Sequence, residues 1–167
     1  MNRLLSLRAF NFGGFIVCSL AMAYAYYSQY VLELDPCPLC IFQRFSMIAL
    51  GILCLIAGIH GAAPRSKAAI SYCVLISIAA LSGIAVATRH VWITMLPADK
   101  VPECGAGLEF IVEMDGWWQG FQYAFQGTGD CAAVDWTFLG MSMPMCVLLV
   151  FVSLLAKNLF WNIRKPS

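Results

Sequence analysis

The stretch that decides the fold is PCPLCIFQR, residues 36–44, followed by FSMIALGILCLIAGIHGAAP, residues 45–64. The second part contains no Asp, Glu, Lys or Arg, and it has the ~20 residues that a helix needs to cross a membrane. The first part carries Cys37 and Cys40 at the spacing C-x-x-C, with Arg44 one helical turn later. Two thiols at this spacing indicate either a redox pair or half of a metal site.

The composition is that of a membrane protein. The 167 residues are 61% hydrophobic and 11% charged, with a mean hydropathy of +0.78, far from the average of soluble proteins. Three further windows lack charged residues, at 9–32, 68–88 and 136–156. We therefore predict an all-α fold, a membrane four-helix bundle forming one domain over residues 1–167. The expected helices cover about 10–31, 41–60, 68–88 and 139–160, and the expected outer loops cover about 32–40 and 89–138.

The charges predict the orientation of this bundle. All nine acidic residues lie in the connection after the first window or in the connection after the third, whereas basic residues gather at both termini and in the second connection. Basic loops remain in the cytoplasm, so both termini are expected inside and both acidic loops outside. A cleaved signal peptide is the alternative for the first window. It is disfavoured because the window is long and ends in four tyrosines typical of a membrane interface.

The C-x-x-C pair is expected at the outer start of the second helix. Pro38 suits the first position of a helix, where a missing N–H costs nothing. Cys40 then lies in the first turn, near unpaired backbone N–H groups, and Arg44 shares its face. Both features favour a thiolate at Cys40, which leaves Cys37 as the residue that meets the long loop. The alternative for Arg44 is an anchor at the membrane interface.

His90 follows Arg89 at the outer end of the third window. At the level of Cys40 and Arg44, a histidine becomes a candidate for binding or protonating a cofactor. The alternative is an ordinary polar residue at the interface.

Two more cysteines, Cys104 and Cys131, lie in the long outer loop. Adjacency favours pairing of Cys37 with Cys40, which leaves Cys104 with Cys131, although four cysteines allow three pairings. A zinc site is the rival, disfavoured because the loop cysteines lack close spacing and no histidine lies among them. An acid precedes each loop cysteine, and a neighbouring carboxylate opposes thiolate formation. The other four cysteines lie in apolar windows and are expected to pack.

Aromatic residues of the long loop fall near helical spacing, at Trp117, Trp118, Phe121 and Phe125. They predict a segment that lies flat on the membrane and tethers the loop. The alternative is an ordinary loop with buried aromatics.

Together these motifs resemble the disulfide bond formation protein B (DsbB) family. They are Cys37-x-x-Cys40-x-x-x-Arg44, His90, Gly129-Asp130-Cys131, Trp136-x-Phe138-Leu139-Gly140 and Met143-Pro144. The resemblance implies a multi-pass enzyme of the bacterial inner membrane that reoxidises a periplasmic dithiol oxidase similar to DsbA. It also implies that Cys104 and Cys131 exchange with this partner and that Cys37 and Cys40 accept the electrons. A quinone, ubiquinone or menaquinone, near Arg44 and His90 would then take the electrons from Cys40.

Other interpretations differ in class. A non-enzymatic membrane scaffold would use a loop stapled by Cys104 and Cys131 to bind a partner. Vitamin K epoxide reductases look related, but there the loop cysteines would precede the C-x-x-C pair, the reverse of the order here. Neither a metal nor a nucleic acid is expected as a partner.

Overall fold

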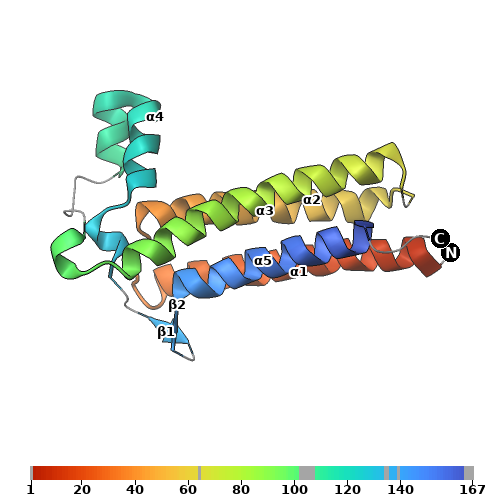
Figure 1. Cartoon of the computed structure of the whole chain (residues 1–167), viewed down its shortest axis with the longest axis horizontal. Helices are drawn as coiled ribbons and strands as arrows, with labels where there is room; N and C mark the ends of the chain where they lie inside the picture. Colours follow the sequence, from red (N-terminus) through yellow and green to blue (C-terminus); the bar gives the residue numbers. More distant parts are fainter. Residues whose placement is uncertain (1, 64, 102–107, 134–135, 139, 164–167) are drawn as a thin grey trace.

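The computed structural model describes residues 2–63, 65–101, 108–133, 136–138 and 140–163. Four of its helices are long and apolar enough to cross a membrane, which confirms the predicted membrane bundle. They run along the long axis of the molecule, with both termini at one end and a further helix, α4, beyond the other end (Figure 1). The four are α1 (Asn2–Tyr30), α2 (Pro38–His60), α3 (Lys67–Thr94) and α5 (Met143–Ile163).

Three helix boundaries differ clearly from the expected ones. α1 begins at Asn2 rather than near residue 10. α3 extends beyond residue 88 to Thr94, because no helix breaker interrupts the chain before Pro97. His90 therefore lies within the helix. α5 begins at Met143, preceded by a short hairpin of β1 (Thr137–Phe138) and β2 (Met141–Ser142). Gly140 in this turn has a φ of 79°, a conformation that glycine adopts without steric cost.

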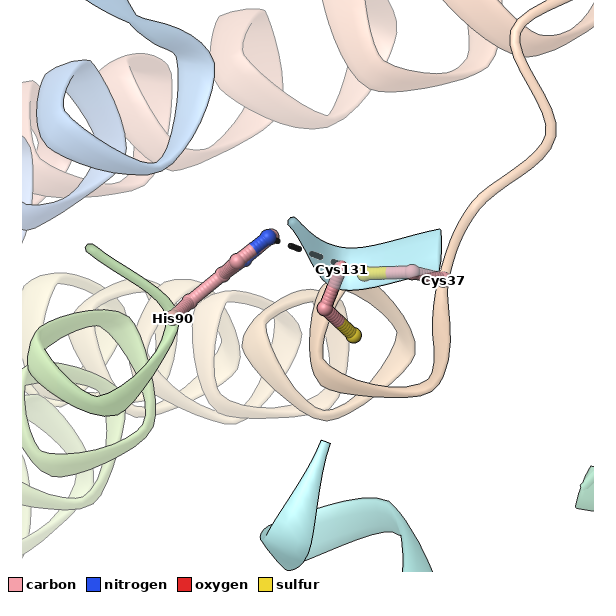
Figure 2. A group of neighbouring side chains, drawn as sticks. All are labelled: Cys37, His90 and Cys131. Atoms are coloured by element: carbon pink, nitrogen blue, oxygen red, sulfur yellow. Dashed lines mark hydrogen bonds between the residues drawn. The ribbon is translucent and has the colours of Figure 1, made fainter. Parts of the chain in front are cut away.

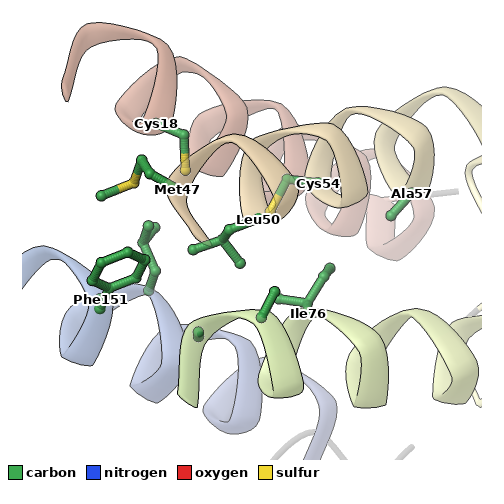
Figure 3. Close-up of a cluster of buried hydrophobic side chains, with 10 residues drawn as sticks. Cys18, Met47, Leu50, Cys54, Ala57, Ile76 and Phe151 are labelled. Atoms are coloured by element: carbon green, nitrogen blue, oxygen red, sulfur yellow. The ribbon is translucent and has the colours of Figure 1, made fainter. Parts of the chain in front are cut away.

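The helices pack in the order α1, α2, α3, α5, and the extensive contacts between them join neighbours in this order. Small residues permit this packing. A Cβ on Gly83 would lie 2.4 Å from the Phe151 ring, and one on Gly14 would lie 3.0 Å from the Cys54 sulfur. Figure 3 shows the cluster that results in the middle of the bundle. Its buried residues are Cys18, Met47, Leu50, Cys54, Ala57, Ile76, Ala79, Ala80, Phe151 and Leu154.

The long loop between α3 and α5 contains α4 (Leu108–Gln126), which Gly116, with φ 86° and ψ 171°, divides into two helical parts. The second part carries Trp117, Trp118, Phe121 and Phe125, which are between 44% and 83% exposed. The alternative of a loop with buried aromatics is therefore wrong. Phe121 packs edge-on against Phe42 of α2, with ring centroids 5.5 Å apart. Contact of this aromatic face with a membrane stays a prediction.

Candidate functional site

Cys37 and Cys40 lie where α2 begins. Cys37 is the N-cap, Pro38 opens the helix, and the Cys37 sulfur accepts a hydrogen bond from the backbone N–H of Cys40. Cys40 therefore lies in the first turn, as the position of Pro38 predicted. The two sulfurs are 3.2 Å apart. A small side-chain movement is enough to bring them within bonding distance.

A glycine turn brings Cys131 to the same place. Gly127 ends α4 with a φ of 79°, and a Cβ there would lie 2.3 Å from Cδ1 of Ile93. The chain can therefore turn against α3 at this point only with glycine. The turn continues into η2 (Gly129–Cys131). Cys131 becomes fully buried there, in a small cluster with Cys37, Leu39 and Ile93.

Three reactive groups from separate parts of the chain meet at this point (Figure 2). The sulfurs of Cys37 and Cys131 and a ring nitrogen of His90 all lie within 4.8 Å of one another. The distance from Cys37 Sγ to His90 Nε2 is 3.8 Å. The structure thus places a loop cysteine beside Cys37. Cys104 lies outside the described residues, so its predicted pairing with Cys131 stays a prediction.

Gln43 holds the other side of the His90 ring. Its amide lies 3.1 Å from His90 Nδ1, and both side chains are buried. The Gln43 amide N–H donates to Nδ1, so in the neutral ring the proton lies on Nε2, which faces the Cys37 sulfur. Sequence reasoning missed Gln43. Its one signal was a polar side chain in the turn after Cys40, and nothing in the sequence linked it to a residue 47 positions away.

Hydrogen bonding makes Cys131 acidic. The pKa of its thiol is lowered to about 6, mainly because the Cys37 thiol donates a hydrogen bond to it, helped by the backbone at Thr128 and Leu39 and by the charge of His90. The same hydrogen bond, with burial, raises the pKa of Cys37. The expectation that a neighbouring acid disfavours the Cys131 thiolate is therefore wrong. The Asp130 carboxylate accepts a hydrogen bond from the Thr128 hydroxyl, with 3.3 Å between Oδ2 and Oγ1.

Arg44 joins α2 to α1. Its guanidinium donates hydrogen bonds to the side chain of Gln29 and, at 3.1 Å, to the carbonyl of Ala25. It also lies 5.4 Å from the ring centroid of Tyr26. These contacts hold the guanidinium against α1.

A cavity of about 130 Å³ lies beside these groups. Cys40, Arg44 and His90 contribute polar atoms, while α1 and α5 supply a mostly apolar wall. Small-molecule sites typically combine an apolar wall with a few polar groups. The wall residues include Ala21, Met22, Ala25, Met47, Trp136, Met143, Pro144 and Val147.

Comparison with known proteins gives matches over most of the chain. The family model described as disulfide bond formation protein DsbB matches residues 7–161. The disulfide bond formation protein B of Xanthomonas axonopodis pv. citri is 43% identical over 165 residues, covering 97% of this chain and 95% of that protein. The proteins of the same name from Marinobacter nauticus and Methylococcus capsulatus are each 42% identical, covering 92% and 91% of this chain and 90% and 93% of their own.

Proposed function

The chain belongs to the disulfide bond formation protein B family, and we propose that it oxidises a periplasmic dithiol protein and passes the electrons to a membrane quinone. The family match, over residues 7–161, supports a disulfide-forming oxidoreductase. The contact of Cys131 with Cys37 carries the finer proposal, because it would let a loop thiol exchange with the C-x-x-C pair. Family membership also weighs against a non-enzymatic scaffold.

The cavity beside Cys40 has the chemistry that a quinone head group requires. Arg44 can donate a hydrogen bond to a carbonyl oxygen, and the apolar wall suits a ring with an isoprenoid tail. When bound, a quinone would accept two electrons and two protons. His90 is the buried group in the cavity that can hold a proton beside the thiols, and Gln43 fixes its ring.

Thiol–disulfide exchange would connect the two cysteine pairs. The partner's dithiol reduces a Cys104–Cys131 disulfide, and the partner leaves as a disulfide. The Cys131 thiolate then attacks the Cys37 sulfur of a Cys37–Cys40 disulfide, forming a Cys131–Cys37 bond and releasing Cys40 as a thiolate. Attack of Cys104 on Cys131 restores the loop disulfide and leaves Cys37 and Cys40 reduced. Two electrons have then moved from the partner to the membrane pair.

The geometry supports the direction of this exchange. The backbone groups at Thr128 and Leu39 and the charge of His90 lower the pKa of the Cys131 thiol, which favours the attacking thiolate. Its target sulfur, Cys37, lies within 4.8 Å. The leaving sulfur, Cys40, lies in the first turn of α2, where the helix dipole stabilises a negative charge.

Basic residues at both termini and between α2 and α3 support a topology with those segments in the cytoplasm. The site at the other end of the bundle would then face the periplasm. A bacterial inner membrane is the corresponding location. The partner would be a soluble dithiol oxidase similar to DsbA, because a free dithiol is the substrate that the loop pair can oxidise.

The test is an anaerobic assay with purified protein in detergent, a reduced DsbA-type protein and a ubiquinone analogue. We expect the loss of quinone absorbance to match the partner disulfide formed, and alkylation of the thiols beforehand to stop both. Oxidation of the partner without quinone consumption would overturn the proposal.

The relay order has its own test. A Cys104→Ala variant should lose reaction with the partner, while Cys37 and Cys40 remain reducible by a small thiol. A Cys40→Ala variant, mildly oxidised, should yield a peptide that links Cys37 to Cys131, detected by mass spectrometry. Oxidation of the partner at the normal rate by Cys104→Ala would show that the order is wrong.

A further inference from the structure

We propose that Cys37, His90 and Cys131 form a binding site for Zn²⁺ when the cysteines are reduced. This site goes beyond the redox function, and metal binding there would compete with thiol exchange. The three side chains come from the N-cap of α2, from α3 and from η2 (Figure 2). All three are buried.

The distances suit tetrahedral zinc. A Zn–S bond is ~2.3 Å and a Zn–N bond ~2.0–2.1 Å, so ligand atoms around one ion lie roughly 3.5–4 Å apart. Cys37 Sγ lies 3.8 Å from His90 Nε2. The Cys131 sulfur is within 4.8 Å of both atoms. A movement of the Cys131 side chain by less than a bond length therefore completes a three-ligand set.

A hydrogen bond to Gln43 can fix His90 for this use. Metal-binding histidines almost always use their second ring nitrogen in a hydrogen bond that fixes tautomer and orientation. Gln43 Nε2 lies 3.1 Å from His90 Nδ1, on the side of the ring opposite to the thiols. Turning the Gln43 amide over places its oxygen there to accept from Nδ1–H, which frees the Nε2 lone pair for the ion.

Sequence reasoning disfavoured zinc because no histidine lies among the loop cysteines. The fold supplies that histidine from α3. Binding replaces the thiol protons of Cys37 and Cys131 with one Zn²⁺, and no electron moves. A disulfide at either cysteine removes a thiolate ligand, so only the reduced protein should bind.

Zinc binding can be measured by competition with a chromogenic chelator, using fully reduced protein in detergent under anaerobic conditions. We expect saturable binding that oxidation of the cysteines abolishes. His90→Ala and Cys131→Ser should each lower the affinity at least about tenfold. Cys146→Ser, in the apolar part of α5, is the matched control and should change the affinity less than about twofold.

The His90→Ala variant decides between this site and binding by the C-x-x-C pair alone. Unchanged affinity in this variant, or retention of zinc by the oxidised protein, would overturn the proposal. Co²⁺ in place of Zn²⁺ gives a second readout, because its thiolate charge-transfer band reports the sulfur ligands. Cys131→Ser should remove about half of that band, and an unchanged band would also overturn the proposal. Because neither readout requires a quinone or a partner, failure here leaves the redox function separately testable.

Discussion

Cys54 and Cys131 are both buried free thiols, yet their surroundings differ. Cys54 lies in the middle of the bundle among apolar side chains such as Met47 and Leu50. Cys131 lies at the end of the bundle where α2 begins, next to the Cys37 thiol and the His90 ring. Burial alone therefore does not separate a packing cysteine from a reactive one. The difference comes from the hydrogen-bond donors and charges around the sulfur.

The largest expected effect follows from removing one of these two thiols. Cys131→Ser should lower the rate of disulfide formation in the partner more than about a hundredfold, because a serine hydroxyl is not ionised at neutral pH and cannot exchange. Cys54→Ser is the control and should retain the rate per folded molecule within about twofold. Steady-state partner oxidation measures both. If Cys54→Ser also oxidised the partner slowly, Cys54 would not be a packing cysteine alone, and the distinction between Cys54 and Cys131 would be wrong.

The next effect concerns pH. The Cys131 pKa of about 6 lies below the ordinary value of a thiol, so the thiolate is fully present above pH 7 and is lost as the pH falls through 6. This value belongs to the reduced protein, in which the Cys37 thiol donates a hydrogen bond to Cys131. The thiolate fraction of Cys131 in the fully reduced protein should therefore be about tenfold lower at pH 5 than at pH 7. The ultraviolet thiolate absorbance that is lost in Cys131→Ser measures this fraction. A midpoint above pH 8 would contradict the surroundings described for Cys131.

Arg44 and Arg8 lie at opposite ends of the bundle, so replacing each of them compares the two ends. Arg44→Ala should raise the apparent KM for quinone about tenfold, since a hydrogen bond from a charged group contributes roughly 1.5–3 kcal/mol. Arg8 donates to the carbonyl of Gly58 near the other end of α2, so Arg8→Ala should leave this KM unchanged. Quinone titrations at saturating partner give both values. An equal change in the two variants would argue against a quinone site beside Arg44.

The smallest effect on activity is expected in the middle of the bundle. Gly83→Ala would place a Cβ 2.4 Å from the Phe151 ring, and such overpacking typically costs about 1–3 kcal/mol. Its thermal unfolding midpoint in detergent should fall, while the rate per folded molecule stays within about twofold. A Cβ on Gly13 would have no heavy atom within 4 Å, so Gly13→Ala should leave the unfolding midpoint unchanged. A large loss of activity in Gly83→Ala would show that the two regions are coupled.

The sequence predicted what depends on local patterns. Charge-free windows located the four helices, and Pro38 located the start of α2 and hence the position of Cys40. The resemblance to the DsbB family is confirmed over most of the chain. Helix boundaries were predicted less well. α3 ends later and α5 begins later than predicted, because no strong helix signal marks either boundary.

What the sequence could not predict depends on contacts between distant segments. The hydrogen bond between Gln43 and His90 joins α2 to α3. The position of Cys131 depends on the turn at Gly127 against Ile93. The effect of Asp130 could not be judged from its place beside Cys131, because it depends on which groups surround the sulfur in space.

The helix order has a consequence for how an apolar ligand arrives. Extensive contacts run from α1 to α2, α3 and α5 in turn, and the cavity is lined by both end members of this series, α1 and α5. We therefore expect a ligand dissolved in the bilayer to enter between α1 and α5 by lateral diffusion, without passing through water. An apolar ligand partitions into the bilayer, so its concentration beside the site is higher than its concentration in water. Tethering raises the effective concentration of a linked ligand in a similar way. The affinity of such a ligand is therefore given by its mole fraction in the lipid at half-saturation, rather than by its concentration in water.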